Sequence, residues 1–386
     1  MKFFQKQKQQ FISQVVIIAI IFGFSAGVVG QIVADVYIDP WQQDYFYQNF
    51  NLNANVDLIP ELRRVKQFLG IEQDFEVNKS INKVAPAVIG IYQKKSAGKT
   101  ILGQIYLPQD LAATGFILTS DGWLVGLGEV FNSLDSKQAV VVYDGKTYAI
   151  NEVIIDSTTD VAFIKISANN LPVVVLGDSD EAISGQLVIG LNGLAEAMVT
   201  NIRNINYRNL NSVNNLAVSS EQYNELILLA GNLNPSYLGS PLINLGGEVV
   251  GVVNEINQTQ NLVTAVPINQ FRSIILDVLK SNIIKRSFLG VNYLDLAWTV
   301  GLDDATSQEL TQGALVYQNP LRTTPAAEIG LQANDIILSV DDQPVDKNSS
   351  LTELIQQYQA GDEVNLEIRR GGQTIVRPVT LGLLAD

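Results

Sequence analysis

Short apolar runs separated by turn dipeptides dominate the chain from about residue 76 to residue 270. Asp121-Gly122, Asp144-Gly145 and Gly246-Gly247 stand between such runs. Pairs of this kind favour two-residue type I′ hairpins, in which both central residues need a positive φ. No helical pattern alternates with these runs, so we expect a β-barrel or a β-sandwich. One helix, from about Ile268 to Leu279, should follow it, because its apolar residues recur at helical spacing.

The last hundred or so residues follow a different pattern, in which helices and strands alternate. A short helix closed by Gly330 precedes a strand over residues 335–340. Ser350 and Glu353 then form a capping box at the start of a second helix. Two further strands are joined by a turn at Gly371-Gly372. This part of the sequence predicts a small, separate α+β module.

The segment from Gln9 to Ala34 contains no charged residue and is rich in Ile, Val, Phe and Gly. It is long enough to span a hydrocarbon core of about 30 Å at about 1.5 Å per helical residue. Lys2, Lys6 and Lys8 precede it, so the positive-inside rule places the N-terminus in the cytoplasm and the body outside. The alternative is a cleaved signal peptide, whose apolar core is usually about 7–15 residues. We expect a single-pass protein of the cell membrane.

The composition excludes several classes of function. The chain has no cysteine and no histidine, so it offers no thiolate nucleophile and no ligands for a typical zinc or copper site. Its net charge of −14, without a basic stripe, argues against binding to nucleic acid. We expect no metal, no cofactor and no nucleic-acid partner. A Ser-His-Asp triad also cannot be built without an imidazole.

Five segments occur in an order that is typical of one known family. They are Thr114–Val125, Ile155–Ile166, residues 171–186, residues 234–244 and Ala265-Val266-Pro267. In this order and spacing they resemble the HtrA (DegP/DegS-like) family of trypsin-like serine proteases. The resemblance implies a mainly β fold, with a trypsin-like double β-barrel followed by a small α+β PDZ domain and preceded by one transmembrane helix.

This resemblance, together with the apolar N-terminal segment, divides the chain into five parts. They are a cytoplasmic tail over residues 1–8, a transmembrane helix over 9–34, a stalk or linker over 35–75, a trypsin-like domain over 76–282 and a PDZ domain over 283–386. The resemblance also implies a homo-oligomer, with a trimer favoured. Aromatic residues from Trp41 to Phe50 fit an interface near the membrane, or alternatively an aromatic belt at the membrane surface.

The resemblance also assigns the positions of a catalytic triad. The histidine position falls on Glu129, the aspartate position on Asp160 and the nucleophile position on Leu238. The oxyanion-hole glycine is replaced by Ser236, whose Cβ tolerates a positive φ poorly, and an upstream acidic residue is replaced by Ala230. We therefore expect no catalytic residue and a pseudoprotease of the HtrA family. It would bind peptides or partner proteins outside the cytoplasm as a scaffold, an adaptor or a regulatory subunit in protein quality control, in some assemblies with an active relative.

The alternative is a hydrolase that uses a non-standard site. Glu129 and Asp160 could share a site in which one carboxyl has a raised pKa and activates water. In the competing interpretation Asp160 caps a turn and Glu129 is solvated. Ser240 could serve as a displaced nucleophile, with Lys165 as the remaining candidate base, although Lys165 matches a non-catalytic lysine of the family.

The C-terminal module carries a second candidate site. Phe288-Leu289-Gly290-Val291 resembles the PDZ loop that presents backbone N–H groups to the carboxylate of a C-terminal peptide. The resemblance implies that the peptide pairs with the strand beyond this loop and lies beside a helix. The residues implied on the strand are Tyr293 and Leu294, and those on the helix are Leu351, Leu354 and Ile355. The alternative is that these are core residues.

Overall fold

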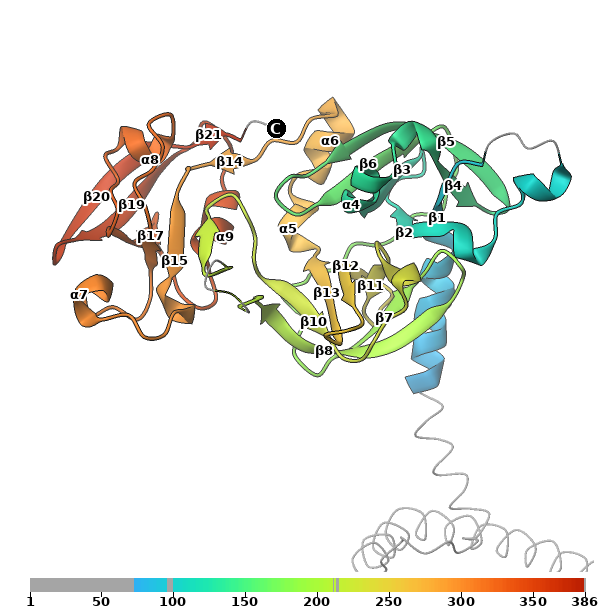
Figure 1. Ribbon diagram of the computed structural model, residues 1–386, viewed down its shortest axis with the longest axis horizontal. Coiled ribbons are helices and arrows are strands. Elements are labelled where there is room, and N and C mark those ends of the chain that lie inside the picture. Colours follow the sequence, from blue (N-terminus) through green and yellow to red (C-terminus); the bar gives the residue numbers. More distant parts are fainter. Residues whose placement is uncertain (1–72, 96–99, 211, 213–214, 385–386) are drawn as a thin grey trace, which may run out of the picture. The chain divides into compact units, whose positions relative to one another are not determined.

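The computed structural model describes residues 73–95, 100–210, 212 and 215–384 (Figure 1). The transmembrane helix expected over 9–34 and nearly all of the expected stalk lie outside these residues. Within the described part of the chain, no helix is long and apolar enough to cross a membrane. The described residues are mainly β, as the sequence predicts, and they form two closed barrels and a further sheet.

The first closed barrel has the strand order β1-β2-β3-β6-β5-β4. Its large aromatic and aliphatic side chains, among them Phe116, Leu124 and Phe163, are fully buried in the main core. Each such side chain stabilises the fold by about 1.5–3 kcal/mol. The strands are β1 (Val88–Gln93), β2 (Leu111–Ile117), β3 (Trp123–Leu127), β4 (Ala139–Tyr143), β5 (Lys146–Ile155) and β6 (Val161–Ile166), with the short α4 (Glu129–Ser133) after β3.

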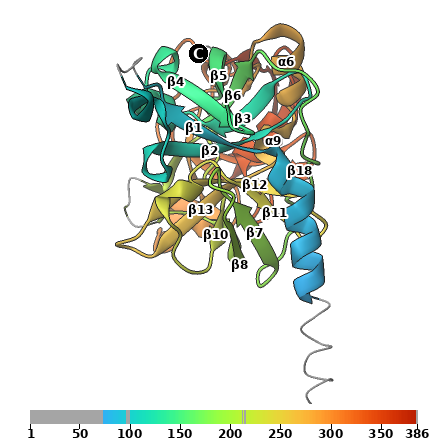
Figure 2. The ribbon, with the colours of Figure 1, turned by 90° about the vertical axis from the view of Figure 1, so that its right-hand side faces the viewer.

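The second closed barrel has the strand order β10-β13-β12-β11-β7-β8, and Figure 2 shows its strands as a group separate from those of the first barrel. The strands are β7 (Leu187–Leu191), β8 (Ala197–Tyr207), β10 (Leu226–Leu229), β11 (Pro241–Ile243), β12 (Val249–Asn257) and β13 (Leu262–Pro267). The single helix expected after β13 is divided into α5 (Asn269–Arg272) and α6 (Ile275–Ser281). The ring of Phe271 on α5 packs edge-on against Phe163 of the first barrel, with centroids 6.4 Å apart.

The turn dipeptides separate strands as expected, but only one of them forms the expected turn. Asp144 and Gly145 both have a positive φ, at 48° and 69°, between β4 and β5. At Asp121-Gly122 only the glycine has a positive φ, because the turn begins earlier and the N–H of Gly122 donates to the carbonyl of Thr119. Gly246-Gly247 behaves in the same way, with the N–H of Gly247 donating to the carbonyl of Asn244. Both are therefore longer hairpins that end in a left-handed glycine.

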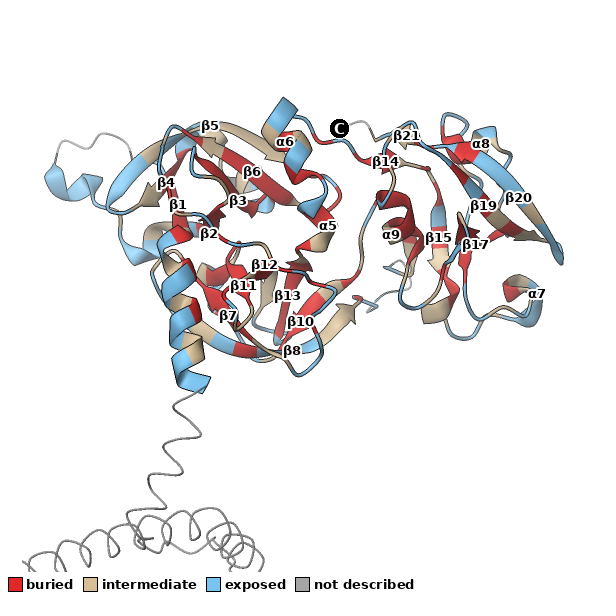
Figure 3. Ribbon diagram, turned by 180° about the vertical axis from the view of Figure 1, so that it is seen from behind, coloured by how far each residue is buried: buried red, intermediate tan, exposed pale blue. Residues whose placement is uncertain are grey.

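The C-terminal module is built on an antiparallel sheet, with a separate pair of short strands. The sheet strands are β15 (Asn292–Asp295), β16 (Ala314–Val316), β17 (Ile336–Val340), β18 (Gln343–Pro344), β19 (Glu363–Arg370) and β20 (Gln373–Thr380). The separate pair is β14 (Ser287–Phe288) with β21 (Gly382–Leu383), and the helices are α7 (Asp304–Ser307), α8 (Pro325–Glu328) and α9 (Leu351–Gln356). Figure 3 shows α9 as largely buried.

The local signals of this module are confirmed. Ser350 accepts from the N–H of Glu353 at the start of α9, and the Glu353 carboxylate accepts from the N–H of Ser350, which completes the capping box. Gly330 has a φ of 72° after α8, and Gly371 and Gly372 both have positive φ values between β19 and β20. These short-range interactions suffice to set the ends of their elements.

One strand of this sheet comes from a distant part of the chain. The strand β9 (Ala217–Ser219) lies in the connection between β8 and β10 of the second barrel, and it pairs antiparallel with β15. The sheet order therefore ends in β16-β15-β9. Residues of the barrel connection and of the C-terminal module share one hydrophobic cluster, which contains Val218 and Tyr293.

Two buried arginines join the barrels to the C-terminal module. Arg208, at the end of β8, donates to Asp295 at 2.8 Å, pairs with the carboxylate of Glu225, and lies over the ring of Trp298 at 4.9 Å. Arg286, just before β14, binds both carboxylate oxygens of Asp156. Buried ion pairs are costly to break, because the remaining charge has no solvent.

Glu353 lies close to this ionic cluster. Burial, together with the nearby carboxylate of Glu225, raises the pKa of Glu353 from 4.5 to about 7, against the opposing effects of the Ser350 hydrogen bonds and the Arg208 guanidinium. A raised pKa in the folded state means that the folded protein holds its proton more tightly than the unfolded chain does. The stabilising contribution of Glu353 is therefore full below about pH 4.5 and is lost as the pH rises through about 7.

We expect Glu353→Gln to be more stable than the wild type at pH 8, by about 1–3 kcal/mol, and this advantage to shrink as the pH falls to 5. The glutamine keeps an oxygen that can accept from Ser350 but carries no charge. Urea unfolding of both proteins at the two pH values measures the effect. Glu363→Gln, at an exposed position, is the matched control, and an advantage of equal size at both pH values would contradict the prediction.

Candidate functional site

The residues at the three triad positions come from loops that the two barrels hold together. The short helix η7 (Pro235–Tyr237) and Leu238 belong to the loop before β11, and β2 of the first barrel binds this loop. The N–H of Thr114 donates to the carbonyl of Leu238 at 2.8 Å, and its hydroxyl donates to the carbonyl of Ser236 at 2.8 Å. Gly239 lies so close to Thr114 that a Cβ there would be 2.1 Å from the Thr114 carbonyl oxygen. A glycine is therefore needed at that position.

Asp160 is half-buried beside the start of α4. Its carboxylate accepts from the N–H of Glu129 at 2.9 Å, and a Cβ on Gly128 would lie 2.5 Å from its other oxygen. The backbone of Asp160 is left-handed, with a φ of 57°. Burial raises the pKa of Asp160 above its ordinary value, and the carboxylates of Glu129 and Asp156 raise it further, while the hydrogen bond from Glu129 lowers it. The Glu129 side chain is exposed.

The nucleophile loop differs in conformation from the sequence expectation. Ser236 lies in the helical turn η7 and does not adopt a positive φ. Its N–H donates to the side chain of Asn234 at 3.1 Å, and its hydroxyl accepts from Asn192 at 3.0 Å. The strain expected from its Cβ is therefore absent, because the loop folds as a turn that any residue tolerates. Leu238 packs with its apolar side chain against the main core.

Ser240 and Lys165 are both engaged elsewhere. Ser240 is fully buried, and its hydroxyl has no hydrogen-bond partner among the described residues. Lys165 forms an ion pair with Asp121 at 2.7 Å and lies 5.4 Å from the ring centre of Trp123. These contacts hold Lys165 at the hairpin between β2 and β3, and among the described residues no hydrogen bond joins it to Ser240.

The PDZ-like loop has the form that the sequence suggests, but its backbone N–H groups already donate to side chains of the same chain. Gly290 has a φ of 82°. The N–H groups of Leu289 and Gly290 donate to one carboxylate oxygen of Glu221, at 3.2 and 2.9 Å, and the N–H of Val291 donates to the hydroxyl of Ser220 at 3.0 Å. These acceptors belong to the same connection as β9.

The other residues implied for the peptide groove lie around this contact. Leu289, Val291, Tyr293, Leu351, Leu354 and Ile355 are buried in the core of the module, while Phe288 and Leu294 are half-buried. The hydroxyl of Tyr293 shares a hydrogen bond with Thr352, and Thr352 donates to the carbonyl of Ser219. Sequence reasoning missed Ser220, Glu221 and Thr352. The partners of Ser220 and Glu221 lie about 70 residues further along the chain, and no local sequence pattern indicates contacts at such a separation.

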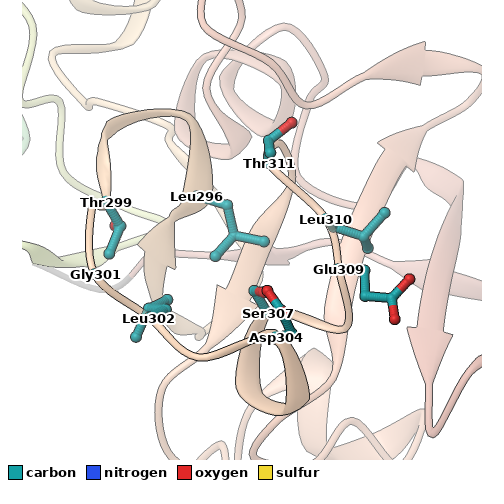
Figure 4. A pocket seen from close by; sticks show the side chains of 9 residues that line it. All are labelled: Leu296, Thr299, Gly301, Leu302, Asp304, Ser307, Glu309, Leu310 and Thr311. Atoms are coloured by element: carbon teal, nitrogen blue, oxygen red, sulfur yellow. The ribbon is translucent and has the colours of Figure 1, made fainter.

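A surface pocket of about 410 Å³ lies elsewhere, in the connection from β15 to β16 (Figure 4). Leu296, Leu302, Asp304, Ser307 and Glu309 are among its lining residues. None of the candidate residues described above lines it. Among the residues that the structure describes, no group of three or more acidic side chains could hold a metal ion.

Comparisons with known proteins identify both modules. Residues 113–252 match the trypsin-like peptidase domain, and residues 300–381 match the PDZ domain. A probable periplasmic serine endoprotease DegP-like of Halomonas elongata is 31% identical over 277 residues, which are 70% of this chain and 56% of that protein. A protein of the same name from Pseudomonas putida is 32% identical over 284 residues, which are 71% of this chain and 56% of that protein. The chain thus spans 56% of the length of these relatives.

Solved structures share the fold. The HtrA-type protease AlgW with a decapeptide has a TM-score of 0.60 at 22% identity, covering 80% of this chain and 98% of that one. The serine endoprotease from Yersinia pestis has a TM-score of 0.52 at 20% identity, covering 80% of this chain and 98% of that one.

These comparisons correct two expectations. The chain was expected to be a proteolytically inactive pseudoprotease and not an enzyme, yet the relatives that match 70% and 71% of it are named probable serine endoproteases. The substitutions at Glu129 and Leu238 exclude one mechanism, and they do not by themselves exclude a reaction class. The expected trypsin-like double barrel and PDZ module are confirmed. The chain belongs to the HtrA family, and it contains a trypsin-like peptidase domain and a PDZ domain.

Proposed function

We propose that the protein is an HtrA-type hydrolase that cleaves protein segments outside the cytoplasm, using a carboxyl pair in place of a histidine-containing triad. The observation that carries the proposal is the half-buried carboxyl of Asp160, whose raised pKa reflects burial and the neighbouring carboxylates. The names of the relatives, periplasmic serine endoproteases, support both the reaction class and the compartment.

The proposed reaction uses water as the nucleophile. One carboxylate of the Glu129–Asp160 pair takes a proton from a water molecule, whose oxygen forms a bond to the carbon of the scissile carbonyl. The protonated partner gives its proton to the carbonyl oxygen. As the carbon–oxygen double bond re-forms, one hydroxyl of the tetrahedral intermediate returns its proton to the pair, the carbon–nitrogen bond breaks, and the leaving amine receives a proton from the pair. The half-buried Asp160 carboxyl, whose pKa is raised, would supply the proton in this reaction, and the Glu129 carboxylate would act as the base.

The alternative nucleophile, Ser240, is less suited to the reaction. Its hydroxyl is fully buried and has no hydrogen-bonded base within the part of the chain that the structure describes. Leu238 supplies no nucleophilic atom at the position where the family has its serine. A direct attack by water therefore fits these residues better than a covalent acyl intermediate. It follows that serine-directed fluorophosphonate reagents should neither label nor inhibit the protein.

We expect the purified full-length protein to cleave labelled, unfolded casein, and Asp160→Asn to lower the rate by at least about a hundredfold. General acid–base catalysis contributes about 10² to 10⁴ in rate, and the amide cannot exchange the proton. The measurement is release of the fluorescent label over time. Glu129→Gln should also lower the rate.

The matched control is Asp144→Asn. Asp144 is exposed in a hairpin and, like Asp160, has a left-handed backbone, with a φ of 48°. Its substitution should leave the rate unchanged, as should Ser240→Ala. The proposal fails if the wild type cleaves nothing, or if Asp160→Asn and Asp144→Asn are equally active. Loss of activity in Ser240→Ala alone would favour the serine.

The PDZ module is proposed to bind C-terminal peptides of partner proteins. The residues proposed for this site are Phe288, Leu289, Gly290, Val291, Tyr293, Leu351, Leu354 and Ile355. The likeness to an HtrA-type protease solved with a decapeptide supports peptide recognition in this fold. The consecutive N–H groups of the loop and the left-handed Gly290 suit a carboxylate. Amidation of a peptide would remove that charge.

A membrane anchor over residues 9–34 and assembly as a homotrimer complete the proposal. The uncharged apolar segment supports the anchor, and the aromatic residues 41–50 support the assembly. We expect the detergent-solubilised full-length protein to sediment with the mass of three chains, because aromatic side chains are enriched at interface cores. Deletion of residues 41–50 should shift the mass towards one chain. A monomer at every concentration would contradict the assembly.

A further inference from the structure

The connection between β8 and β10 lies on the PDZ module as a peptide ligand would. The strand β9 pairs antiparallel with β15, with Ser219 opposite Asn292 and Val218 opposite Tyr293. The pairing continues beyond β9, because the N–H of Ser220 donates to the carbonyl of Val291 at 2.8 Å. Addition of a strand to an open sheet edge is the usual way in which a sheet binds an extended peptide.

The side chain of Glu221 occupies the place of a terminal carboxylate. One of its oxygens accepts from the N–H groups of Leu289 and Gly290, and from the hydroxyl of Ser220 at 2.5 Å. Its other oxygen accepts from the hydroxyl of Ser219 at 2.5 Å. Carboxylate oxygens that accept from backbone N–H groups form stronger hydrogen bonds than neutral acceptors do. The side-chain carboxylate of Glu221 thus provides the charged acceptor that the terminal carboxylate of a bound peptide would provide.

The contact is buried and specific. Ser220 is fully buried, and Glu221 and Val218 are nearly so, at 8% and 7% exposure. Val218 belongs to the hydrophobic cluster of the PDZ module, and the carbonyl of Ser219 accepts from Thr352 at the start of α9. The segment therefore meets the sheet edge, the helix and the N–H loop at the same time.

From these contacts we propose that residues 217–221 are an internal ligand of the PDZ module, and that a C-terminal peptide binds only by displacing them. The ligand class is an extended peptide with a free carboxylate, for which Glu221 is the built-in substitute. This proposal rests on the peptide recognition included in the proposed function. It adds that the site is occupied by the chain itself in the absence of such a peptide.

Displacement would also change the second barrel, because the internal ligand is one of its connections. The segment is bounded by Arg208 at the end of β8 and by Glu225 before β10, and these two residues form an ion pair. Tyr223 lies between them, near the guanidinium of Arg286. Since Arg286 also binds Asp156, the released segment adjoins the loop that carries Asp160.

The test uses the full-length protein and a labelled hexapeptide that copies residues 215–220 and ends in a free carboxylate. Fluorescence anisotropy measures its affinity for the wild type and for Glu221→Gln. The variant keeps the size of the side chain but removes the charge, which weakens the internal ligand. We expect it to bind the probe at least about tenfold more tightly than the wild type. The amidated probe should bind both proteins more weakly than the free acid does.

The control variant is Glu181→Gln, which removes one negative charge at an exposed position of the peptidase domain. It should bind the probe as the wild type does. Hydrogen exchange measured by mass spectrometry supplies a second readout that does not depend on probe affinity. Residues 217–221 should exchange slowly in the wild type, and faster in Glu221→Gln or at a saturating concentration of probe.

The two readouts separate the possible failures. Equal exchange of residues 217–221 in the wild type and in Glu221→Gln, together with equal probe affinities, would overturn the internal ligand. Simultaneous binding of the probe and slow exchange of the segment would also overturn it, because both cannot occupy one edge. If Glu221→Gln releases the segment but no free-acid peptide binds, the internal ligand stands and the proposed peptide recognition fails.

Discussion

The buried ion pair between Arg286 and Asp156 connects the start of the PDZ module to the loop that carries Asp160. Arg286 precedes the PDZ module, and Asp156 begins the loop that ends at Asp160. Asp156 also accepts from the side chain of Thr159, and its carbonyl accepts from the N–H of Asp160, so that one carboxylate organises the whole loop. Removal of one member of a buried pair typically costs about 3–5 kcal/mol. The left-handed backbone of Asp160 is held in place by these contacts, because aspartate adopts that conformation at a small cost only where its surroundings require it.

A second link runs through the strand β9. The ion pairs of Arg208 with Glu225 and Asp295 lie near this strand, and both links are made of buried, hydrogen-bonded charges. Such contacts are stable when complete, and they become unfavourable when one partner moves. The two modules are therefore coupled through a small number of discrete contacts. Under the proposed displacement, a change at the PDZ groove would reach the loop of Asp160 through Arg286, which contacts the ring of Tyr223 and pairs with Asp156.

The sequence predicted those features that depend on neighbours in the chain. The capping box of α9 and the turn at Gly371-Gly372 follow from interactions over two or three residues. The predicted type of the turn at Asp121-Gly122 was wrong, because the closing hydrogen bond joins Thr119 and Gly122, one residue earlier than a dipeptide rule assumes. The strand β9 has three residues and forms only by pairing with β15, so no local pattern could reveal it.

Asp160 and Glu129 were found as candidates from the family resemblance, whereas the raised pKa of Asp160 depends on burial that only the fold supplies. The expectation of inactivity was wrong because it inferred the loss of a reaction class from the loss of one set of residues.

An internal ligand lowers the apparent affinity of the PDZ module for external peptides, because the two compete for one groove. A tethered segment competes at an effective concentration that is commonly millimolar for short linkers, whatever the concentration of protein. If the segment occupied the groove 99 times in 100, the apparent affinity of a peptide would fall about a hundredfold, since only the free fraction can bind. Chain ends that bind weakly would then leave the groove closed. A peptide that makes additional contacts on α9 or in the loop would open it. The charge of Glu221 sets the affinity that an external peptide needs, because it determines how strongly the Glu221 side chain binds the N–H groups that would otherwise bind a terminal carboxylate.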